Sequence, residues 1–372
     1  MGGMSSCFAK KNPAMESETS KGWVNLQSGM KVDESLIQEA AVLLLQQREN
    51  NSIEASQVFD RSFSAKSPLM GKKKQQGLPR NASSRARSIT DPDIPLQDLL
   101  NRERGVDDLE TKKVVLVHGG GFGAWCWYKT MSLLADASLL GDAGFEVTAI
   151  NLAGSVTHSV DANNITSLSE YLNPLITFLE KLGDTEKVIL VGHDFGGTCI
   201  SYAMEAFPAK IAKSVFLAAF MLKNGQRTVE NSTNELMQQA QIFLYANGKD
   251  QTPTAISLET SLLNDLLFNQ SPTKDIALAS VSMRPIPFAP ILEELQLTDN
   301  NYGSVRRFYI EATEDNALPL PLQQRLCESN PPEKVFRLKG SDHSPFFSKP
   351  QALHKILLEI AAISPNQNLK NL

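Results

Sequence analysis

The sequence predicts an α/β fold, a mostly parallel, doubly wound sheet with a helical cap inserted into it. Two observations carry this prediction: β-branched apolar runs alternate with helix-like segments from residue 111 onward, and two of the runs end in glycine-rich turns. Strands that alternate with helices form a parallel sheet covered on both faces. The expected strands are residues 111–117, 144–151, 187–191, 213–220, 308–313 and 335–338, and the expected core helices include 168–182 and 198–205.

The cap is predicted from a change of pattern between residues 221 and 290. Short helix-like pieces at 235–246 and 258–268 are joined there by turns that contain Pro and Asn. Apolar side chains of this segment either line a substrate pocket or pack the cap on itself. They are Phe243, Leu244, Leu267 and Phe268.

Length and composition restrict the classes of protein. The chain has 372 residues and a formal net charge of −5, and its 42% hydrophobic content fits a globular core. It has no apolar run of about 18 residues, so we expect no transmembrane helix. The four Cys lack metal-site spacing and indicate reduced thiols. Because no nucleic-acid module and no dinucleotide-binding glycine motif are recognised, we expect neither a nucleic-acid partner nor a cofactor or metal.

The most informative motif is residues 192–196, which read Gly-His-Asp-Phe-Gly. A strand-like run precedes them and a helix-like run follows, which is the context of the nucleophile elbow of an α/β-hydrolase. The usual elbow reads Gly-x-Ser-x-Gly, and here Asp194 takes the place of the serine. The flanking glycines permit the strained turn. The alternative is a glycine-rich turn with a surface or N-capping aspartate.

A second glycine-rich turn, His118 to Gly121, follows the strand at 111–117. A loop of this His-Gly-Gly-Gly type offers backbone N–H groups to a developing oxyanion. A phosphate-binding loop is the alternative, but it would require a following Lys-Ser/Thr pair, which is absent. The loop therefore predicts an oxyanion hole.

Two further polar residues follow later strands. Asp315 comes after the strand at 308–313, and His343 comes after the strand at 335–338. Catalytic groups collect at the strand ends of such a sheet, and the chain order of nucleophile, acid and histidine agrees with this fold. We expect His343 to be the base and Asp315 to orient it. Glu314 and Asp342 remain rivals for the role of Asp315.

These motifs together resemble the plant methylesterase family, which is related to the hydroxynitrile lyases. The resemblance covers residues 111–365, and the N-terminal extension is similar to that of a chloroplastic subgroup. Matching segments are residues 114–129, 186–193, 215–221, 313–315 and 339–343. The resemblance implies hydrolysis of methyl esters of small plant hormones of the indole-acetate, jasmonate or salicylate type. It also implies a small-molecule ester as partner. Because related proteins dimerise through their lids, the resemblance is compatible with a homodimer.

The resemblance also assigns roles to individual positions. Asp194 takes the nucleophile position, and Gly120 and Phe195 supply the oxyanion-hole N–H groups. Phe122 stands where the family often has a histidine. Phe122, Trp125 and Phe346 are the predicted substrate-binding residues.

The aspartate leaves three chemical interpretations open. Asp194 supports ester hydrolysis, by attack or as a general base that holds a water molecule. Alternatively it attacks a saturated carbon, as in epoxide and haloalkane hydrolases, because a carboxylate is a competent covalent nucleophile. The third interpretation is a ligand-binding protein without turnover.

Residues 1–105 predict a disordered, basic and Ser-rich extension or targeting segment, and residues 106–372 the hydrolase domain. Within the extension, residues 61–90 include eight basic residues and no acidic one, a composition typical of a solvated tail. The family resemblance implies a chloroplast protein. The alternatives are the cytosol, or peripheral membrane contact through myristoylation at Gly2 and palmitoylation at Cys7.

Overall fold

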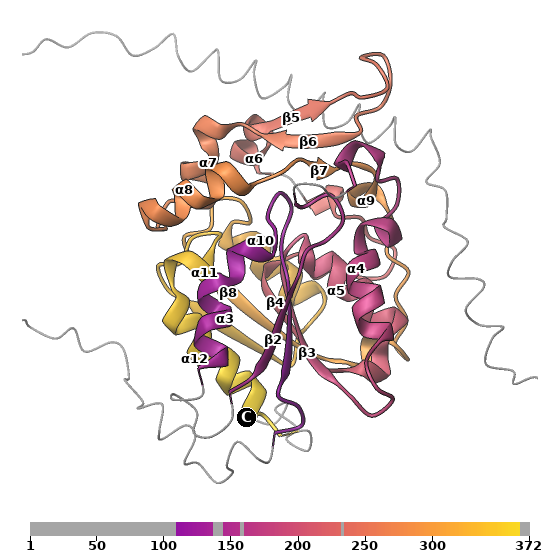
Figure 1. Ribbon diagram of the computed structural model, residues 1–372, viewed down its shortest axis with the longest axis vertical. Coiled ribbons are helices and arrows are strands. Elements are labelled where there is room, and N and C mark those ends of the chain that lie inside the picture. Colours follow the sequence, from indigo (N-terminus) through magenta and orange to yellow (C-terminus); the bar gives the residue numbers. More distant parts are fainter. Residues whose placement is uncertain (1–108, 137–143, 157–159, 232–233, 365–372) are drawn as a thin grey trace, which may run out of the picture. The chain divides into compact units, whose positions relative to one another are not determined.

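The structure, a computed structural model, describes residues 109–136, 144–156, 160–231 and 234–364 (Figure 1). All of them belong to the larger of two units of the chain, Val32–Leu372. The predicted extension, with Gly2 and Cys7, lies outside the described residues. Within the described ranges, no helix is long and apolar enough to cross a membrane.

The centre of the fold is a six-stranded sheet in the order β2-β1-β3-β4-β8-β9. Every neighbouring pair in it is parallel, as the alternating pattern predicts. All six predicted strands are present, with ends shifted by a few residues. They are β1 Lys113–Val117, β2 Glu146–Ile150, β3 Val188–Asp194, β4 Ile211–Ala219, β8 Arg306–Ala312 and β9 Lys334–Leu338.

Side chains alternate between the two faces of each strand, so both faces of the sheet carry apolar residues. Helices cover both faces. In β1, Val115 and Val117 join one hydrophobic cluster, and Val114 and Leu116 join the other. The first cluster includes residues of α4 (Leu168–Glu180), α5 (Gly196–Ala206) and α10 (Leu320–Ser329). The second includes residues of α3 (Tyr128–Ala135), α11 (Pro345–Ser348) and α12 (Pro350–Ala362). Figure 1 shows α3 and α12 on one side of the strands and α4 and α5 on the other.

The cap lies between β4 and β8 and covers one end of the sheet in Figure 1. It contains a three-stranded antiparallel sheet in the order β5-β6-β7 as well as helices. Its elements are α6 Glu235–Ala240, β5 Gln241–Leu244, β6 Ala255–Leu258, α7 Leu263–Leu267, α8 Thr273–Ser282, β7 Ile286–Pro287 and α9 Ala289–Leu292. Short 3-10 turns in the described residues are Ala124–Trp127, Ala162–Asn164, Pro208–Lys210, Val229–Asn231, Thr260–Leu262 and Tyr302–Ser304.

The cap corrects one part of the sequence analysis. A helix over residues 235–246 is wrong beyond Ala240, because Gln241 adopts an extended backbone and residues 241–244 pair with β6. The piece at 258–268 likewise begins as the last residue of β6 and becomes helical only afterwards. Ile242 and Phe243 favour strands and pair with residues of β6. A local helical pattern does not reveal this pairing.

Candidate active site

The nucleophile elbow forms as predicted, at the junction of β3 and α5. Asp194 is the last residue of β3 and has a φ of 51°, the left-handed conformation that side chains rarely adopt. The surrounding backbone is crowded, since a Cβ on Gly197 would lie 2.4 Å from the carbonyl oxygen of Phe220. A Cβ on Gly192 would lie 2.6 Å from the carbonyl oxygen of Gly196. Only glycine fits these positions, and the turn presents Asp194 at the end of the strand.

The carboxylate of Asp194 is bound by the predicted oxyanion hole itself. Its Oδ2 atom accepts a hydrogen bond of 2.9 Å from the backbone N–H of Gly120. The neighbouring Phe195 backbone also lowers the pKa of this carboxyl and so favours its ionised form. A Cβ on Gly119 would lie 2.7 Å from Oδ2, so the glycine loop packs directly against this oxygen. Of the two predicted N–H donors, that of Gly120 therefore binds the side chain in the nucleophile position.

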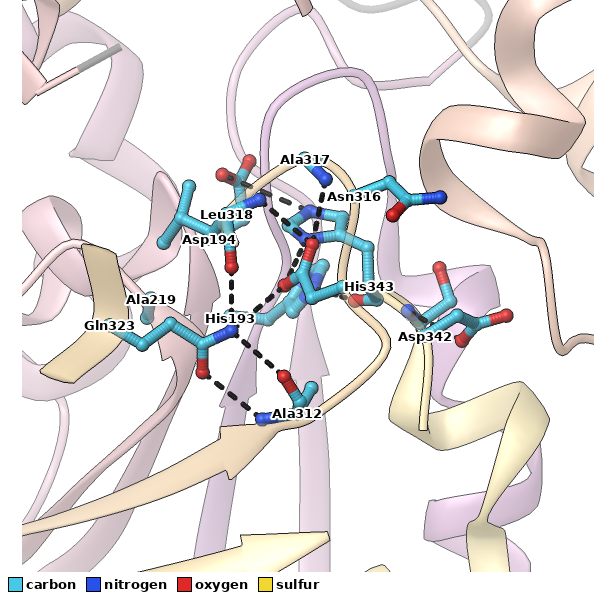
Figure 2. A network of polar contacts seen from close by, with 12 residues as sticks. His193, Asp194, Ala219, Ala312, Asn316, Ala317, Leu318, Gln323, Asp342 and His343 are labelled. Carbon is cyan, nitrogen blue, oxygen red and sulfur yellow. Dashed lines mark hydrogen bonds and ion pairs between the residues drawn. The ribbon is translucent and has the colours of Figure 1, made fainter. Parts of the chain in front are cut away.

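His343 joins the two predicted acidic residues of the site. Its Nδ1 atom lies 2.9 Å from Oδ2 of Asp315, and its Nε2 atom lies 3.9 Å from Oδ1 of Asp194. The first distance is a hydrogen bond and the second is an ion-pair separation without one. His343 is 1% exposed, so both contacts form away from solvent (Figure 2).

Asp315 is held rigidly by its own loop. Its Oδ1 atom accepts hydrogen bonds of 2.8 Å from the backbone N–H groups of Ala317 and Leu318. Its Oδ2 atom accepts a 3.3 Å hydrogen bond from Gln323, in addition to the contact with His343. Figure 2 shows Gln323 bridging from this loop to Ala312 at the end of β8. The carboxylate can orient the imidazole because it cannot itself reorient.

The two rivals of Asp315 have other surroundings. Glu314 is exposed. Asp342 accepts hydrogen bonds from Gln270, Ser271 and Ser344, which tie the cap and the following turn together. The contact with His343 Nδ1 therefore belongs to Asp315 in this structure.

The charges around His343 favour its protonated form. Burial by itself lowers the pKa of His343, but the nearby carboxylates of Asp315, Asp194 and Asp342 outweigh it and raise the pKa to about 9. Burial raises the pKa of Asp194, while the imidazolium and the N–H groups of Phe195 and Gly120 oppose that shift. Hydrogen bonds to a carboxylate favour its ionised form. The site thus favours a protonated His343 between Asp315 and Asp194.

His193 supports this arrangement, a role the sequence analysis did not assign. Its Nε2 atom lies 2.7 Å from the carbonyl oxygen of His343. A carbonyl only accepts, so Nε2 carries the proton. Burial holds the pKa of His193 well below its usual value, and the ring is neutral. In the sequence, only its position in the elbow motif pointed to this role of His193. No sequence pattern pointed to the role of Gln323 in holding Asp315.

The cap reaches the oxyanion loop through residues that the sequence analysis missed. A Cβ on Gly120 would lie 2.9 Å from Cδ1 of Ile286, and a Cβ on Gly121 would lie 3.1 Å from Cε of Met283. The backbone N–H of Arg284 donates to the carbonyl oxygen of Gly121 at 3.0 Å. The cap therefore lies directly on the loop that binds Asp194.

Two of the three predicted substrate-binding residues, Phe122 and Phe346, lie beside His193, and the third, Trp125, stacks on Phe122. The Phe122 ring centroid is 5.4 Å from that of His193, 5.7 Å from that of Phe346 and 5.9 Å from that of Trp125. Phe122 and Phe346 are buried in this aromatic cluster, and Trp125 is half-buried. A contact with substrate stays a prediction for all three.

The predicted apolar cap residues divide between two places. Phe268 contacts Phe122, with ring centroids 6.1 Å apart, so it reaches the aromatic cluster. Phe243 instead packs on Phe288, within the cap itself. Leu267 is buried and joins the same large cluster as Phe122 and Phe268. Leu244 is half-buried.

Comparison with known proteins agrees with this geometry. The model of the "Alpha/beta hydrolase family" matches residues 114–356. "Putative methylesterase 11, chloroplastic" of Arabidopsis thaliana is 62% identical over 312 residues, which cover 82% of this chain and 78% of that protein. Methyl jasmonate esterase 1 of Vitis vinifera is 38% identical, with 66% of this chain and 95% of that protein covered. A crystal structure of a tomato methylketone synthase I variant with beta-ketoheptanoate has a TM-score of 0.62 and 37% identity, covering 68% of this chain and 97% of that chain.

The names of methylesterase 11 and of two further relatives carry the chloroplast label, which supports a chloroplast location for this protein. With the matched family model, the formed elbow and these identities, the chain belongs to the alpha/beta hydrolase family of enzymes, within its methylesterase group.

Proposed function

We propose that this enzyme hydrolyses the methyl ester of a small carboxylic acid of the plant-hormone type, such as indole-acetate, jasmonate or salicylate, to the acid and methanol. The observation that carries the proposal is the line of Asp315, His343 and Asp194 at the strand ends, with the N–H of Gly120 on Asp194. Such a line can bring a nucleophile, a proton carrier and an anion-stabilising pair to one ester.

The relatives give the substrate class its support. Two of them are named as a methylesterase and a methyl jasmonate esterase. The similar methylketone synthase shows that the same fold also hosts other reactions, so the fold alone does not decide the substrate. The aromatic cluster of Phe122, Trp125 and Phe346, two of which contact His193, supports a flat or apolar acid. In this proposal His343 carries the proton and Asp315 orients it.

A second candidate is displacement at the saturated carbon of an epoxide or alkyl halide. One observation favours it: Gly120 already binds Oδ2 of Asp194, which leaves Oδ1 facing His343 as the reactive oxygen. A carboxylate in this position forms an ordinary alkyl ester when it attacks such a carbon.

Methanol release from a panel of hormone methyl esters tests the proposal, with the full chain as enzyme. We expect release that is lost in His343→Gln and retained in His354→Gln, whose histidine lies in α12 outside the site. Melting curves of both variants show whether they fold. Release of diol or halide from epoxides or haloalkanes, with none from esters, would establish the second candidate. Binding of the esters without any product would establish a ligand-binding protein.

A further inference from the structure

The two oxygens of the Asp194 carboxylate have different surroundings. Oδ2 accepts a hydrogen bond of 2.9 Å from the N–H of Gly120 and lies in close contact with the loop at Gly119. Oδ1 faces Nε2 of His343 at 3.9 Å, a separation too long for a direct hydrogen bond. The Asp194 side chain is 13% exposed, whereas that of Asp315 is fully buried. One oxygen is therefore anchored, and the other can reach a ligand.

This geometry conflicts with attack on an ester carbonyl. In that reaction the carbonyl oxygen of the substrate becomes the oxyanion and needs the N–H groups of the hole. Here the N–H of Gly120 binds the carboxylate of Asp194 instead, and the Phe195 backbone favours the ionised form of that carboxyl. Attack on the carbonyl would also convert Asp194 into an anhydride. The oxyanion hole thus binds Asp194, the residue at the position where a serine enzyme has its nucleophile.

We propose that Asp194 attacks the methyl carbon of the ester, so that the enzyme breaks the bond between the methyl group and the ester oxygen. The inference rests on the proposed function and names the bond that is cleaved. In the first step Oδ1 forms a bond to the methyl carbon. The bond from that carbon to the ester oxygen breaks, and its electron pair leaves with the carboxylate product. Asp194 becomes a methyl ester.

The first step needs no base, which fits a protonated His343. The leaving group is a carboxylate, a stable anion, and one methyl carboxylate ester replaces another. The transfer is therefore close to balanced in free energy, and hydrolysis of the second ester drives the reaction forward.

The second step uses the oxyanion hole as the structure has it. Methylation removes the charge of Asp194, one of the charges that raise the pKa of His343, so that pKa falls. The imidazolium then loses its proton to solvent, and the neutral ring acts as a base. His343 then takes a proton from water, and the water oxygen bonds to Cγ of Asp194. The electron pair of the carbonyl moves onto Oδ2, which already lies on the N–H of Gly120.

Collapse of this intermediate restores the enzyme. The bond from Cγ to Oδ1 breaks, and the departing methoxide takes the proton from His343 and leaves as methanol. Asp194 then ionises and returns its proton to His343. Overall one ester and one water give a carboxylate, methanol and one proton, and the water oxygen stays in Asp194.

The substrate class follows from the first step. Displacement requires an unhindered saturated carbon, so a methyl ester reacts and a phenyl ester of the same acid does not. Attack on the carbonyl gives the opposite order, because phenolate is the better leaving group.

Single-turnover hydrolysis in heavy-oxygen water tests the inference directly, with the full chain and any methyl ester that it hydrolyses. We expect no heavy oxygen in the product acid and its appearance in a peptide that contains Asp194. Heavy oxygen in the acid would overturn the inference while the proposed function stands.

Two variants complete the test. In His343→Gln we expect a methylated Asp194, detected by mass spectrometry, because the first step proceeds and the second does not. In Asp194→Ser, which frees the N–H of Gly120, any hydrolysis should place heavy oxygen in the acid. If the wild type releases no methanol and His343→Gln forms no methylated Asp194, both the proposed function and this inference fail.

Discussion

Two regions of the site hold a buried carboxylate against His343, and they are built differently. In the loop after β8, Asp315 contacts Nδ1 and is fixed by two backbone N–H groups and Gln323. In the elbow after β3, Asp194 faces Nε2, has one oxygen bound by Gly120 and leaves the other without a direct hydrogen bond to the histidine. In our proposal the same residue type therefore positions His343 in one region and reacts with the substrate in the other.

The largest expected effect distinguishes the two carboxylates by chemistry. Asp194→Asn keeps the shape of the side chain but removes the carboxylate that we propose as the nucleophile, and we expect methanol release to fall by roughly 10⁶-fold, as for loss of a nucleophile elsewhere. Turnover numbers with the best ester measure this. The matched control is Asp275→Asn, a buried carboxylate that accepts a hydrogen bond from Tyr128 and pairs with Lys129, which should lower stability and spare turnover. Wild-type turnover in Asp194→Asn would show that Asp194 does not react and would contradict the proposed difference between the two carboxylates.

Asp315→Asn should have a smaller effect, because the residue acts through His343. Loss of an orienting carboxylate costs roughly 10⁴-fold in turnover in comparable sites. Its charge and hydrogen bond also raise the pKa of His343, so that pKa should fall in the variant. Turnover measured against pH and nuclear magnetic resonance titration of His343 test both statements. An unchanged histidine titration would show that Asp315 does not control the imidazole.

The dependence of stability on pH should report the same ion pairs. The pKa of His343 is raised from 6.5 to about 9 in the folded protein, so its stabilising contribution is complete below pH 6.5 and is lost as the pH rises through about 9. The contribution lost is about 3 kcal/mol. Urea unfolding at about pH 6 and about pH 10 measures it. His343→Gln should lack this part of the alkaline decline, and an identical decline in both proteins would contradict the assignment.

The smallest effect concerns the support of Asp315. Gln323 is fully buried and bonds the backbone of Ala312 and Leu318 as well as Asp315. Gln323→Leu removes these hydrogen bonds, which should cost about 1–3 kcal/mol of unfolding free energy and lower turnover less than Asp315→Asn does. Gln296→Leu, at an exposed position, is the matched control and should change little. Equal losses in the two variants would show that the Gln323 network is unimportant.

Much of the fold is predictable because it is locally encoded. Short β-branched runs predict the strands. Glycines around a polar residue, between a strand and a helix, predict the elbow. The helix predicted at 235–246 failed beyond Ala240, since residues 241–244 find their partners in β6 at 255–258. Pairing across the chain overrides a local pattern there.

The sequence by itself determined the parallel sheet, the elbow with Asp194 and the chain order of Asp194, Asp315 and His343, because each depends on neighbouring residues. Only the tertiary structure decided that Asp315, and not Glu314 or Asp342, contacts His343. It also decided that the N–H of Gly120, 74 residues away in sequence, binds Oδ2 of Asp194. Hydrogen bonds of this kind depend on distances of a few ångströms between segments far apart in the chain, and no local pattern of residues encodes those distances.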